Sequence, residues 1–351
     1  MIYLLVAFLI VIIALVFLED YVQPYHRYIY AGLCVGLILM AGLRPMGLDP
    51  DSMTYEKMFL QLDNEALALQ VEYSFIAISK ALRLITDDVR IVFLFYAILG
   101  ISLKLWAIRR LTPWYFLPIA IYFGNYFILH DFIQIRVGVS SALLLMALKP
   151  LSENRKWAAA AYITCAVFFH YSALILYLLL LFSNKPLSKA WKIGLSLILP
   201  TGILLFLLRI DFLTFIPIPY FQNKVEVYRK LADIGIFDAV SLLSPFMWLK
   251  AFVLLYLLFF YDTVYKYCPQ LPILLKAQGL ALFFFFAFSS IPVFSGRIFE
   301  LFGIVEIILF PYLFYTILPR KASLVIVCGI GVIEFVFTIF IWKLLDFWPY
   351  S

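Results

Sequence analysis

Residues 2 to 18 read IYLLVAFLIVIIALVFL, an apolar stretch without a single charged side chain. A stretch of this length and composition is typical of a helix that crosses a lipid bilayer. It runs directly into Glu19 and Asp20, and no basic leader or small-residue cleavage site accompanies it. We therefore expect a retained membrane span rather than a removed signal peptide.

The composition of the whole chain agrees with this first segment. Hydrophobic residues make up 65% of the 351 residues and charged residues 14%, with a mean hydropathy of +1.02. A soluble domain carries about 25% charged residues, so this chain must be embedded in lipid. About twelve apolar segments follow one another, at residues 2–18, 28–43, 89–107, 114–129, 133–148, 157–170, 172–183, 191–209, 241–261, 271–290, 298–318 and 322–342. The prediction is an all-α integral membrane protein, a polytopic bundle of about 12 transmembrane helices forming one membrane domain over residues 1–351.

The net charge of +6 does not indicate a nucleic-acid-binding protein. Lys and Arg occur in short clusters between apolar segments rather than on one basic face, as charge bias across a membrane requires. The four cysteines are far apart, without CxxC or metal-type spacing, and we expect no disulfide.

The charge clusters also predict an orientation. Basic clusters at residues 109–110, 149–156, 185–192 and 320–321 mark one side, which should be cytoplasmic. The acidic segment 44–88 then lies on the outer side of the membrane, as does the segment 210–240. Within the first of these, residues 72–86 are expected to form an interfacial amphipathic helix.

The loop after the second apolar segment, GLRPMGLDPD at residues 42–51, presents Arg44, Asp49 and Asp51 beside two prolines that stiffen the turn. Tyr55 follows Asp51 by four residues. An ordinary solvated loop is the alternative to a functional site here. An aspartate pair suits Mg²⁺ or Ca²⁺, but the sequence offers no further ligands beside it, so we expect neither a metal nor a cofactor.

Two arginines lie at the predicted starts of apolar helices. Arg136 follows His130-Asp131-Phe132-Ile133-Gln134-Ile135, and Arg297 follows Ser295-Gly296. An arginine at such a place either forms a structural ion pair, for Arg136 with Asp131 or Glu72, or binds phosphate with its planar set of donors. Helix N-termini attract anions, which favours the phosphate interpretation.

His170 lies between two apolar segments that are each short for a membrane span. A buried core histidine and a catalytic base are both compatible with this position. The other histidines are His26 and His130, and the chain has neither HExxH nor CxxC, so a zinc site is not expected.

These residues, in this order, resemble the EpsG family of bacterial Wzy-type polysaccharide polymerases. The resemblance runs from about residue 40 to about residue 310. It includes Gly42-Leu43-Arg44 with Gly47, Asp49, Asp51 and Tyr55, then Glu72 before an aromatic residue, Gln134 and Arg136, Phe169-His170 and Arg297. One departure is Val137 after Arg136, where the family often has glutamine, and this leaves the role of Gln134 open.

The resemblance implies a membrane glycosyltransferase of the GT-C type in the bacterial inner membrane. Such enzymes make O-antigen, capsule or exopolysaccharide by joining undecaprenyl-pyrophosphate-linked oligosaccharides, as donor and acceptor, at the periplasmic face. The lipid pyrophosphate is the leaving group, and a chain-length regulator and a flippase are the protein partners the resemblance suggests.

The resemblance and the residues together suggest a role for each candidate. Arg136 and Arg297, with Arg209 as a third, would bind the pyrophosphate. His170, Asp49 or Asp51 would be the base. Arg44 and Glu72 would hold the loop and the acceptor sugar, with Tyr55 and Gln134 as further substrate-binding residues. Direct displacement with inversion is the preferred mechanism, because no nucleophile pair for a covalent intermediate is evident.

Two other classes of protein remain as alternatives. A transporter or flippase for polyprenyl-linked sugars or lipids would also place charges in the membrane, although its repeats are not evident in the sequence. A membrane acyltransferase would use His170 but gives no reason for the arginines.

Overall fold

The computed structural model describes residues 1–63, 71–208, 226–227, 230, 241, 244–289 and 291–347. All of the secondary-structure elements in this described part are helical. The chain divides into two compact units, one formed by Met1–Tyr177 with Ile307–Ser351 and the other by Leu178–Glu306.

The first unit is built from long helices, short connecting helices and two stretches of π-helix. Its first half contains α1 (Ile2–Phe17), η1 (Gln23–Tyr25), α2 (His26–Gly42), α3 (Ser52–Leu60), α5 (Tyr73–Arg83) and α6 (Arg90–Leu111). Then follow α7 (Leu117–Ile121), the π-helix η2 (Tyr122–Ile133), α8 (Ile135–Ser152), α9 (Lys156–Phe169) and the start of the 3-10 helix η3 (Tyr171–Leu181). The end of the chain adds η5 (Phe310–Tyr315), α17 (Arg320–Val336) and the π-helix η6 (Phe337–Ile341).

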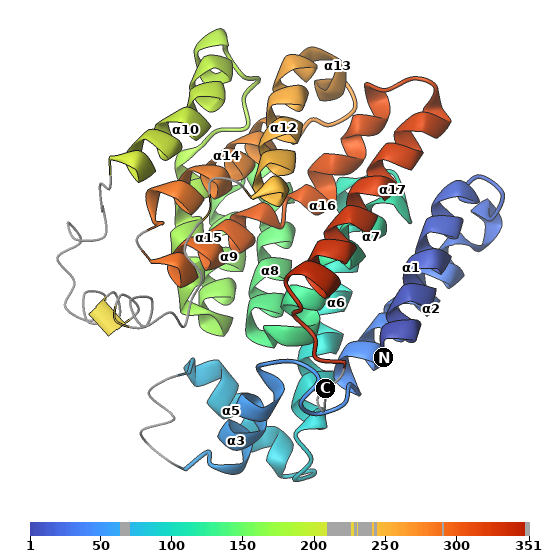
Figure 1. Cartoon of the computed structure of the whole chain (residues 1–351), viewed down its shortest axis with the longest axis vertical. Coiled ribbons are helices and arrows are strands. Elements are labelled where there is room, and N and C mark those ends of the chain that lie inside the picture. Colours follow the sequence, from blue (N-terminus) through green and yellow to red (C-terminus); the bar gives the residue numbers. More distant parts are fainter. Residues whose placement is uncertain are drawn as a thin grey trace. The chain divides into compact units, whose positions relative to one another are not determined.

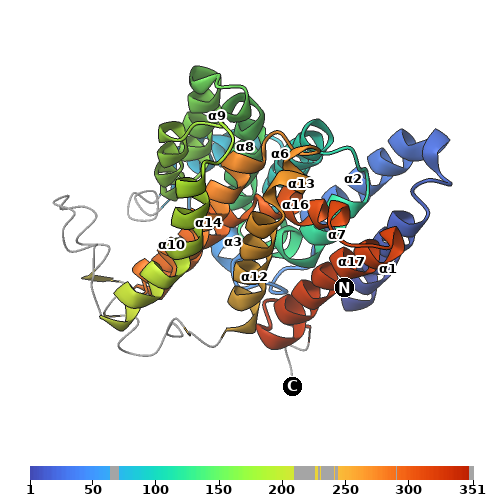
Figure 2. The same ribbon diagram turned by 90° about the horizontal axis from the view of Figure 1, so that it is seen from above.

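The second unit contains α10 (Lys189–Leu207), α12 (Pro245–Phe259), α13 (Tyr261–Tyr265), α14 (Leu271–Ala287) and α15 (Pro292–Gly303), and α16 (Glu306–Leu309) begins at its last residue. Helix α14 packs against α10, α12 and α15 and is the central helix of this unit (Figure 2).

The predicted apolar segments all overlap helices. Among the residues that the structure describes, five helices or continuous helical runs are long and apolar enough to cross a membrane. These are Arg90–Leu111, Ile135–Ser152, Lys189–Leu207, Pro292–Tyr315 and Arg320–Ile341. Further apolar helices of 10–17 residues include Ile2–Phe17, Lys156–Phe169 and Leu271–Ala287. The chain is thus a helical membrane protein, as predicted. The count of about twelve crossings and the likeness to the GT-C plan stay predictions.

Helices α6, α8 and α9 lie side by side in the first unit, and α2 packs on α6 (Figure 1). On another side, α17 packs against α7, η2 and α1 (Figure 2). Glycines make this second contact very close: a Cβ atom on Gly124 would lie 2.4 Å from the carbonyl oxygen of Gly331. Small residues at helix crossings allow such approach of two backbones in a membrane protein.

The two ends of the first unit differ in composition. The short helices α3 and α5 lie at one end of α6, α8 and α9, together with the start of α8 and the break after α9 (Figure 1). The opposite helix ends carry the basic residues Arg109, Arg110, Arg155 and Lys156. This agrees with the alternation inferred from the sequence, while the identification of the basic end as cytoplasmic remains a prediction.

Candidate active site

Glu72 joins two of the predicted site residues through one buried carboxylate. The residue is 4% exposed. Its Oε2 accepts a hydrogen bond from Nη1 of Arg136, and its Oε1 accepts one from Nδ1 of His170 at 2.9 Å. The backbone N–H of Tyr171 also donates to Oε1, at 3.3 Å. A carboxylate, a guanidinium and an imidazole therefore form one continuous cluster.

Three separate elements supply this cluster. Glu72 precedes α5 in an extended conformation, Arg136 is the second residue of α8, and His170 lies at the break between α9 and η3. The start of α5 is tied to that break, because Ser74 Oγ donates to the carbonyl oxygen of Phe168 at 2.5 Å. The predicted helix at residues 72–86 and the predicted break at His170 are both confirmed.

Arg136 also contacts aromatic side chains. Its Nε donates to the hydroxyl of Tyr55 at 3.5 Å, and its guanidinium carbon lies 5.7 Å from the Tyr55 ring and 5.9 Å from the Phe75 ring. The side chain is 19% exposed. Of the two ion-pair partners that the sequence left open for Arg136, the structure selects Glu72 and pairs Asp131 elsewhere. An arginine held in this way keeps donors for a further anion, because its guanidinium has five N–H groups.

The charge state of Glu72 follows from its neighbours. Burial alone would raise the pKa of Glu72, but the hydrogen bond from His170 and the charge of Arg136 outweigh it and lower the pKa to about 2. Burial raises the pKa of Tyr55, so this hydroxyl stays neutral. At neutral pH the Glu72 carboxylate is therefore ionised.

Arg44 and Asp49 form a separate, fully buried ion pair. Nε of Arg44 donates to Oδ2 of Asp49 at 2.8 Å, with both side chains 0% exposed. Nη1 of Arg44 donates to the carbonyl oxygen of Ala41 at 2.8 Å, and its guanidinium lies 3.8 Å from the centre of the Phe93 ring. This pair fastens the loop after α2 to the start of α6.

Asp49 also organises the start of α3. Its Oδ1 accepts hydrogen bonds from the backbone N–H of Asp51 at 3.1 Å and of Ser52 at 2.9 Å. Gly47, with a φ of +76°, makes the bend that brings this loop back, a conformation that glycine adopts without strain. Both oxygens of Asp49 therefore have structural partners, and Asp51 is the residue that immediately precedes α3.

The remaining predicted residues have different placements. Gln134 lies at the break between η2 and α8, two residues before Arg136. Arg297 belongs to the second unit and is half-buried. It lies inside α15 rather than at a helix start, because that helix begins at Pro292, five residues earlier. Arg209 lies outside the described residues.

The sequence analysis missed a polar cluster inside the first unit. Nζ of Lys104 donates to the two carboxylate oxygens of Asp131, at 2.7 and 2.8 Å, and to the carbonyl oxygen of Gly138 at 2.6 Å. The hydroxyl of Tyr122 donates to the same carboxylate at 2.7 Å. A lysine in the middle of an apolar helix is the signal that would have revealed it.

A comparable cluster lies in the second unit. Nζ of Lys250 donates to Oε2 of Glu306, and Nε2 of Gln278 donates to Oε1 at 2.7 Å. Lys250 and Glu306 are both fully buried. The described residues include no group of three His, Cys, Asp or Glu side chains arranged to hold a metal ion.

Fold and site together define a class: a polytopic helical membrane protein with a buried carboxylate that binds an arginine and a histidine. Comparison with protein families gives a match to the EpsG family over residues 27–351. The chain belongs to the EpsG family, as the sequence resemblance suggested, and this membership indicates a function of the polysaccharide polymerase type. Searches of curated proteins and of solved structures returned no match.

Proposed function

We propose that this protein is a polysaccharide polymerase whose active site is the cluster of Glu72, Arg136 and His170. Its substrates would be undecaprenyl-pyrophosphate-linked oligosaccharides, joined at the periplasmic face of the bacterial inner membrane. The observation that carries the proposal is the bridging carboxylate of Glu72, which holds a base and a cation beside each other.

His170 acts as the base in this proposal. With its Nδ1–H donated to Glu72, the nitrogen that takes a proton from the acceptor hydroxyl is Nε2. The acceptor oxygen then attacks the anomeric carbon of the donor sugar, and the imidazolium that forms is stabilised by the carboxylate. This arrangement of a base oriented by a third group recurs in acid–base catalysis.

Arg136 serves the other half of the reaction. As the bond between the anomeric carbon and the pyrophosphate oxygen breaks, negative charge grows on the leaving group. A guanidinium beside it stabilises that charge in a site where water is largely excluded. Direct displacement gives inversion at the anomeric carbon. For Arg297, the role of binding the pyrophosphate is proposed on the sequence resemblance alone.

His170 is the better candidate for the base than Asp49 or Asp51. Asp49 is bound to Arg44 and to two backbone N–H groups at the start of α3. It would have to give up these partners before it could accept a proton. We therefore assign Asp49 and Asp51 to the support of the loop, and Arg44 with them.

The test is polymerisation by the purified, reconstituted protein with a lipid-linked repeat unit. His170→Gln should lower turnover by about a hundredfold or more, because an amide can donate a hydrogen bond to Glu72 but cannot take up the proton. The matched control is His26→Gln, since the His26 imidazole also makes a local hydrogen bond, with the carbonyl oxygen of Glu19 at 2.6 Å. Near-normal turnover in His170→Gln would contradict the assignment of the base.

The same preparation separates the three classes of activity. A ladder of polymer products supports the proposal. Movement of the lipid-linked unit across the bilayer without polymer would instead indicate a transporter, and acyl transfer would indicate an acyltransferase.

A further inference from the structure

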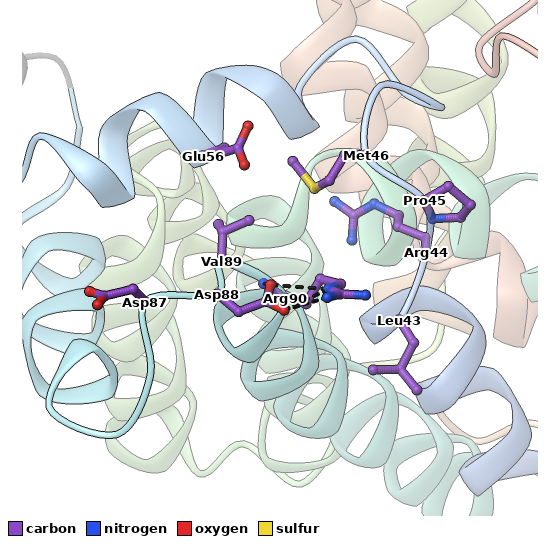
Figure 3. A pocket seen from close by; sticks show the side chains of 9 residues that line it. All are labelled: Leu43, Arg44, Pro45, Met46, Glu56, Asp87, Asp88, Val89 and Arg90. Carbon is purple, nitrogen blue, oxygen red and sulfur yellow. Dashed lines mark hydrogen bonds and ion pairs between the residues drawn. The ribbon is translucent and has the colours of Figure 1, made fainter.

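A second polar space opens in the first unit, away from the Glu72 cluster (Figure 3). It has a volume of about 500 Å³ and lies between the loop after α2, the helix α3 and the turn before α6. Its polar lining consists of Arg44, Glu56, Asp87, Asp88 and Arg90. A space of this size suits a small molecule or a short segment of a larger ligand.

Arg44 offers this pocket a buried donor. Its Nε and Nη1 are bound to Asp49 and to Ala41, whereas Nη2 is buried and has no hydrogen-bond partner among the described residues. Figure 3 shows the guanidinium directed toward the space beside Met46 and Val89. A buried N–H group without an acceptor is unfavourable, so this nitrogen calls for an acceptor oxygen from a ligand.

Two of the three pocket carboxylates already have partners: Asp87 accepts a hydrogen bond from Nε of Arg83 at 3.2 Å, and Asp88 accepts hydrogen bonds from Arg90. Each carboxylate has further lone pairs that can accept from a ligand. Glu56, Asp87 and Asp88 can only accept hydrogen bonds when ionised. Hydrogen bonds from Arg90 lower the pKa of Asp88, which keeps that carboxylate ionised. A ligand that satisfies both Arg44 and the carboxylates must present donors and acceptors close together, as neighbouring hydroxyl groups do.

The charges and side chains of the pocket lining further restrict the kind of ligand that it can bind. The pocket lining contains three carboxylates against two arginines. Asp49 balances Arg44, and Arg83 and Arg90 pair with Asp87 and Asp88, which leaves the negative charge of Glu56. This surplus of negative charge repels phosphate and pyrophosphate. The pocket lining contains no aromatic ring on which a ligand could stack, and its polar and charged side chains do not favour a lipid chain.

The pocket is connected to the Glu72 cluster through α3 and Phe93. Tyr55 on α3 contacts Arg136, and the next residue, Glu56, lines the pocket. The Tyr55 ring lies 6.2 Å from the Phe93 ring, and the guanidinium of Arg44 lies 3.8 Å from the centre of the same ring. The pocket and the Glu72 cluster are thus separated by the packed side chains of Tyr55 and Phe93.

We propose that this pocket is a subsite for a neutral saccharide, which it binds through hydroxyl groups. Its occupant is a sugar of the oligosaccharide chain that does not itself react. This proposal rests on the polymerase function proposed above, because only a glycan substrate supplies such a ligand beside the Glu72 cluster.

A binding experiment tests the subsite directly. The probe is the free repeat-unit oligosaccharide released by mild acid from the lipid-linked unit, titrated into the purified full-length protein by calorimetry or saturation-transfer NMR. The double variant Glu56→Gln with Asp87→Asn should weaken binding at least tenfold. The matched control is Glu153→Gln, an exposed carboxylate that is also paired with an arginine.

Three results would overturn the subsite: no saturable binding to the wild-type protein, unchanged affinity in the double variant, or displacement of the saccharide by inorganic pyrophosphate. The last result would mark an anion site.

Turnover measurements separate this proposal from the polymerase function. In the double variant, the KM for the acceptor should rise while kcat stays near that of the wild type. A wild-type protein that binds the free saccharide in the expected way but forms no polymer would refute the polymerase function and leave the subsite standing. Polymer formation with saccharide binding that is indifferent to Glu56 and Asp87 would refute the subsite alone.

Discussion

Glu72 has two partners that depend on its negative charge in different ways. Arg136 is positively charged at every accessible pH, whereas His170 gains its charge only when it takes up a proton. Because the pKa of Glu72 is lowered to about 2, the carboxylate does not titrate in the range where an imidazole does. We therefore expect a single protonation, that of His170, to limit activity on the acid side.

Replacing Glu72 with glutamine tests this expectation through the pH profile of kcat/KM. Without the carboxylate, protonated imidazole loses its stabilising neighbour, so a more acidic solution is needed to protonate it. The acid limb should then move to lower pH, and the maximal rate should fall about tenfold or more because the base is weaker and less well oriented. An acid limb that stays at the wild-type pH in Glu72→Gln would show that His170 is not the titrating group.

The lowered pKa of Glu72 also makes the stability of the folded protein depend on pH. A depressed carboxyl pKa stabilises the folded protein above the unfolded value near 4.5, and this contribution is lost as pH falls toward about 2. Thermal unfolding between pH 7 and pH 3 should therefore depend less on pH in Glu72→Gln than in the wild type. Equal pH dependence in both proteins would contradict the ion-paired state of Glu72.

Arg136→Lys distinguishes a point charge from a planar guanidinium. Lysine keeps the positive charge but loses the fork that can bind Glu72, Tyr55 and a phosphate oxygen together. We expect polymerisation to fall by about one to two orders of magnitude in Arg136→Lys and further in Arg136→Ala. The control is Arg155→Lys, at an exposed arginine at the opposite end of the first unit, and it should keep wild-type activity. Full activity in Arg136→Ala would contradict the assignment of Arg136 to the leaving group.

At the level of single residues, the sequence was sufficient to select Glu72, Arg136 and His170. Each is an ionisable side chain at the edge of an apolar segment, where burial of charge is costly. It was not sufficient to show that one carboxylate serves both partners, because they are 64 and 98 residues away from it. Arg44 and Asp49 were also found, but their complete burial depends on packing against Phe93 that no local pattern reveals.

At the level of elements, Lys104 connects the two segments on either side of the break that precedes Arg136. It binds Asp131 near the end of η2 and the carbonyl oxygen of Gly138 in the first turns of α8. The fit leaves little room, since a Cβ atom on Gly138 would lie 2.9 Å from Oδ1 of Asp131. Lys104 thereby fixes the direction in which α8 leaves the break.

Lys104→Met should therefore destabilise the protein by about 3–5 kcal/mol, because it leaves the carboxylate of Asp131 buried without its cation. Adding Asp131→Asn should recover part of that loss, since it removes the uncompensated charge. Thermal unfolding in detergent is the measurement. Lys149→Met, which breaks an exposed pair with Glu153, should cost less than about 1 kcal/mol, and an equal cost for both lysines would disprove the role of Lys104.

Most elements could be predicted because apolar segments between charged turns are a strong signal. The break at His170 and the helix after Glu72 followed from the same signal. The π-helix η2 and the buried Lys104 were not foreseen. Hydropathy averaged over a whole apolar segment reveals neither a change in helix type nor a single charged residue inside it. The start of α15 at Pro292 was placed too late for a related reason: its first residues are mixed in polarity.

At the scale of the whole molecule, the separation of charge between the two ends of the first unit predicts a fixed orientation. In a variant without the native cysteines, Asp63→Cys and Arg155→Cys should react with a membrane-impermeant thiol reagent from opposite sides. Both side chains are exposed, Asp63 at 88% and Arg155 at 55%. Asp63→Cys should be labelled in intact cells and Arg155→Cys only after the membrane is opened. The reverse pattern would place the Glu72 cluster on the cytoplasmic side.

The first unit is also discontinuous along the chain, and this matters for biosynthesis. Its first part ends at Tyr177 and its second begins at Ile307, so the 129 residues of Leu178–Glu306 lie between them. At about 5–20 residues per second, a ribosome needs roughly 6–26 seconds to synthesise those residues. Helices α7 and η2 lack their partner α17 throughout this interval and until α17 itself has been made, because Gly331 of α17 must approach Gly124 to within backbone contact. Until its last helix is made, the nascent protein therefore exposes the surface of α7 and η2 that α17 later covers. This is the period in which an insertase or chaperone would have the largest exposed surface to protect.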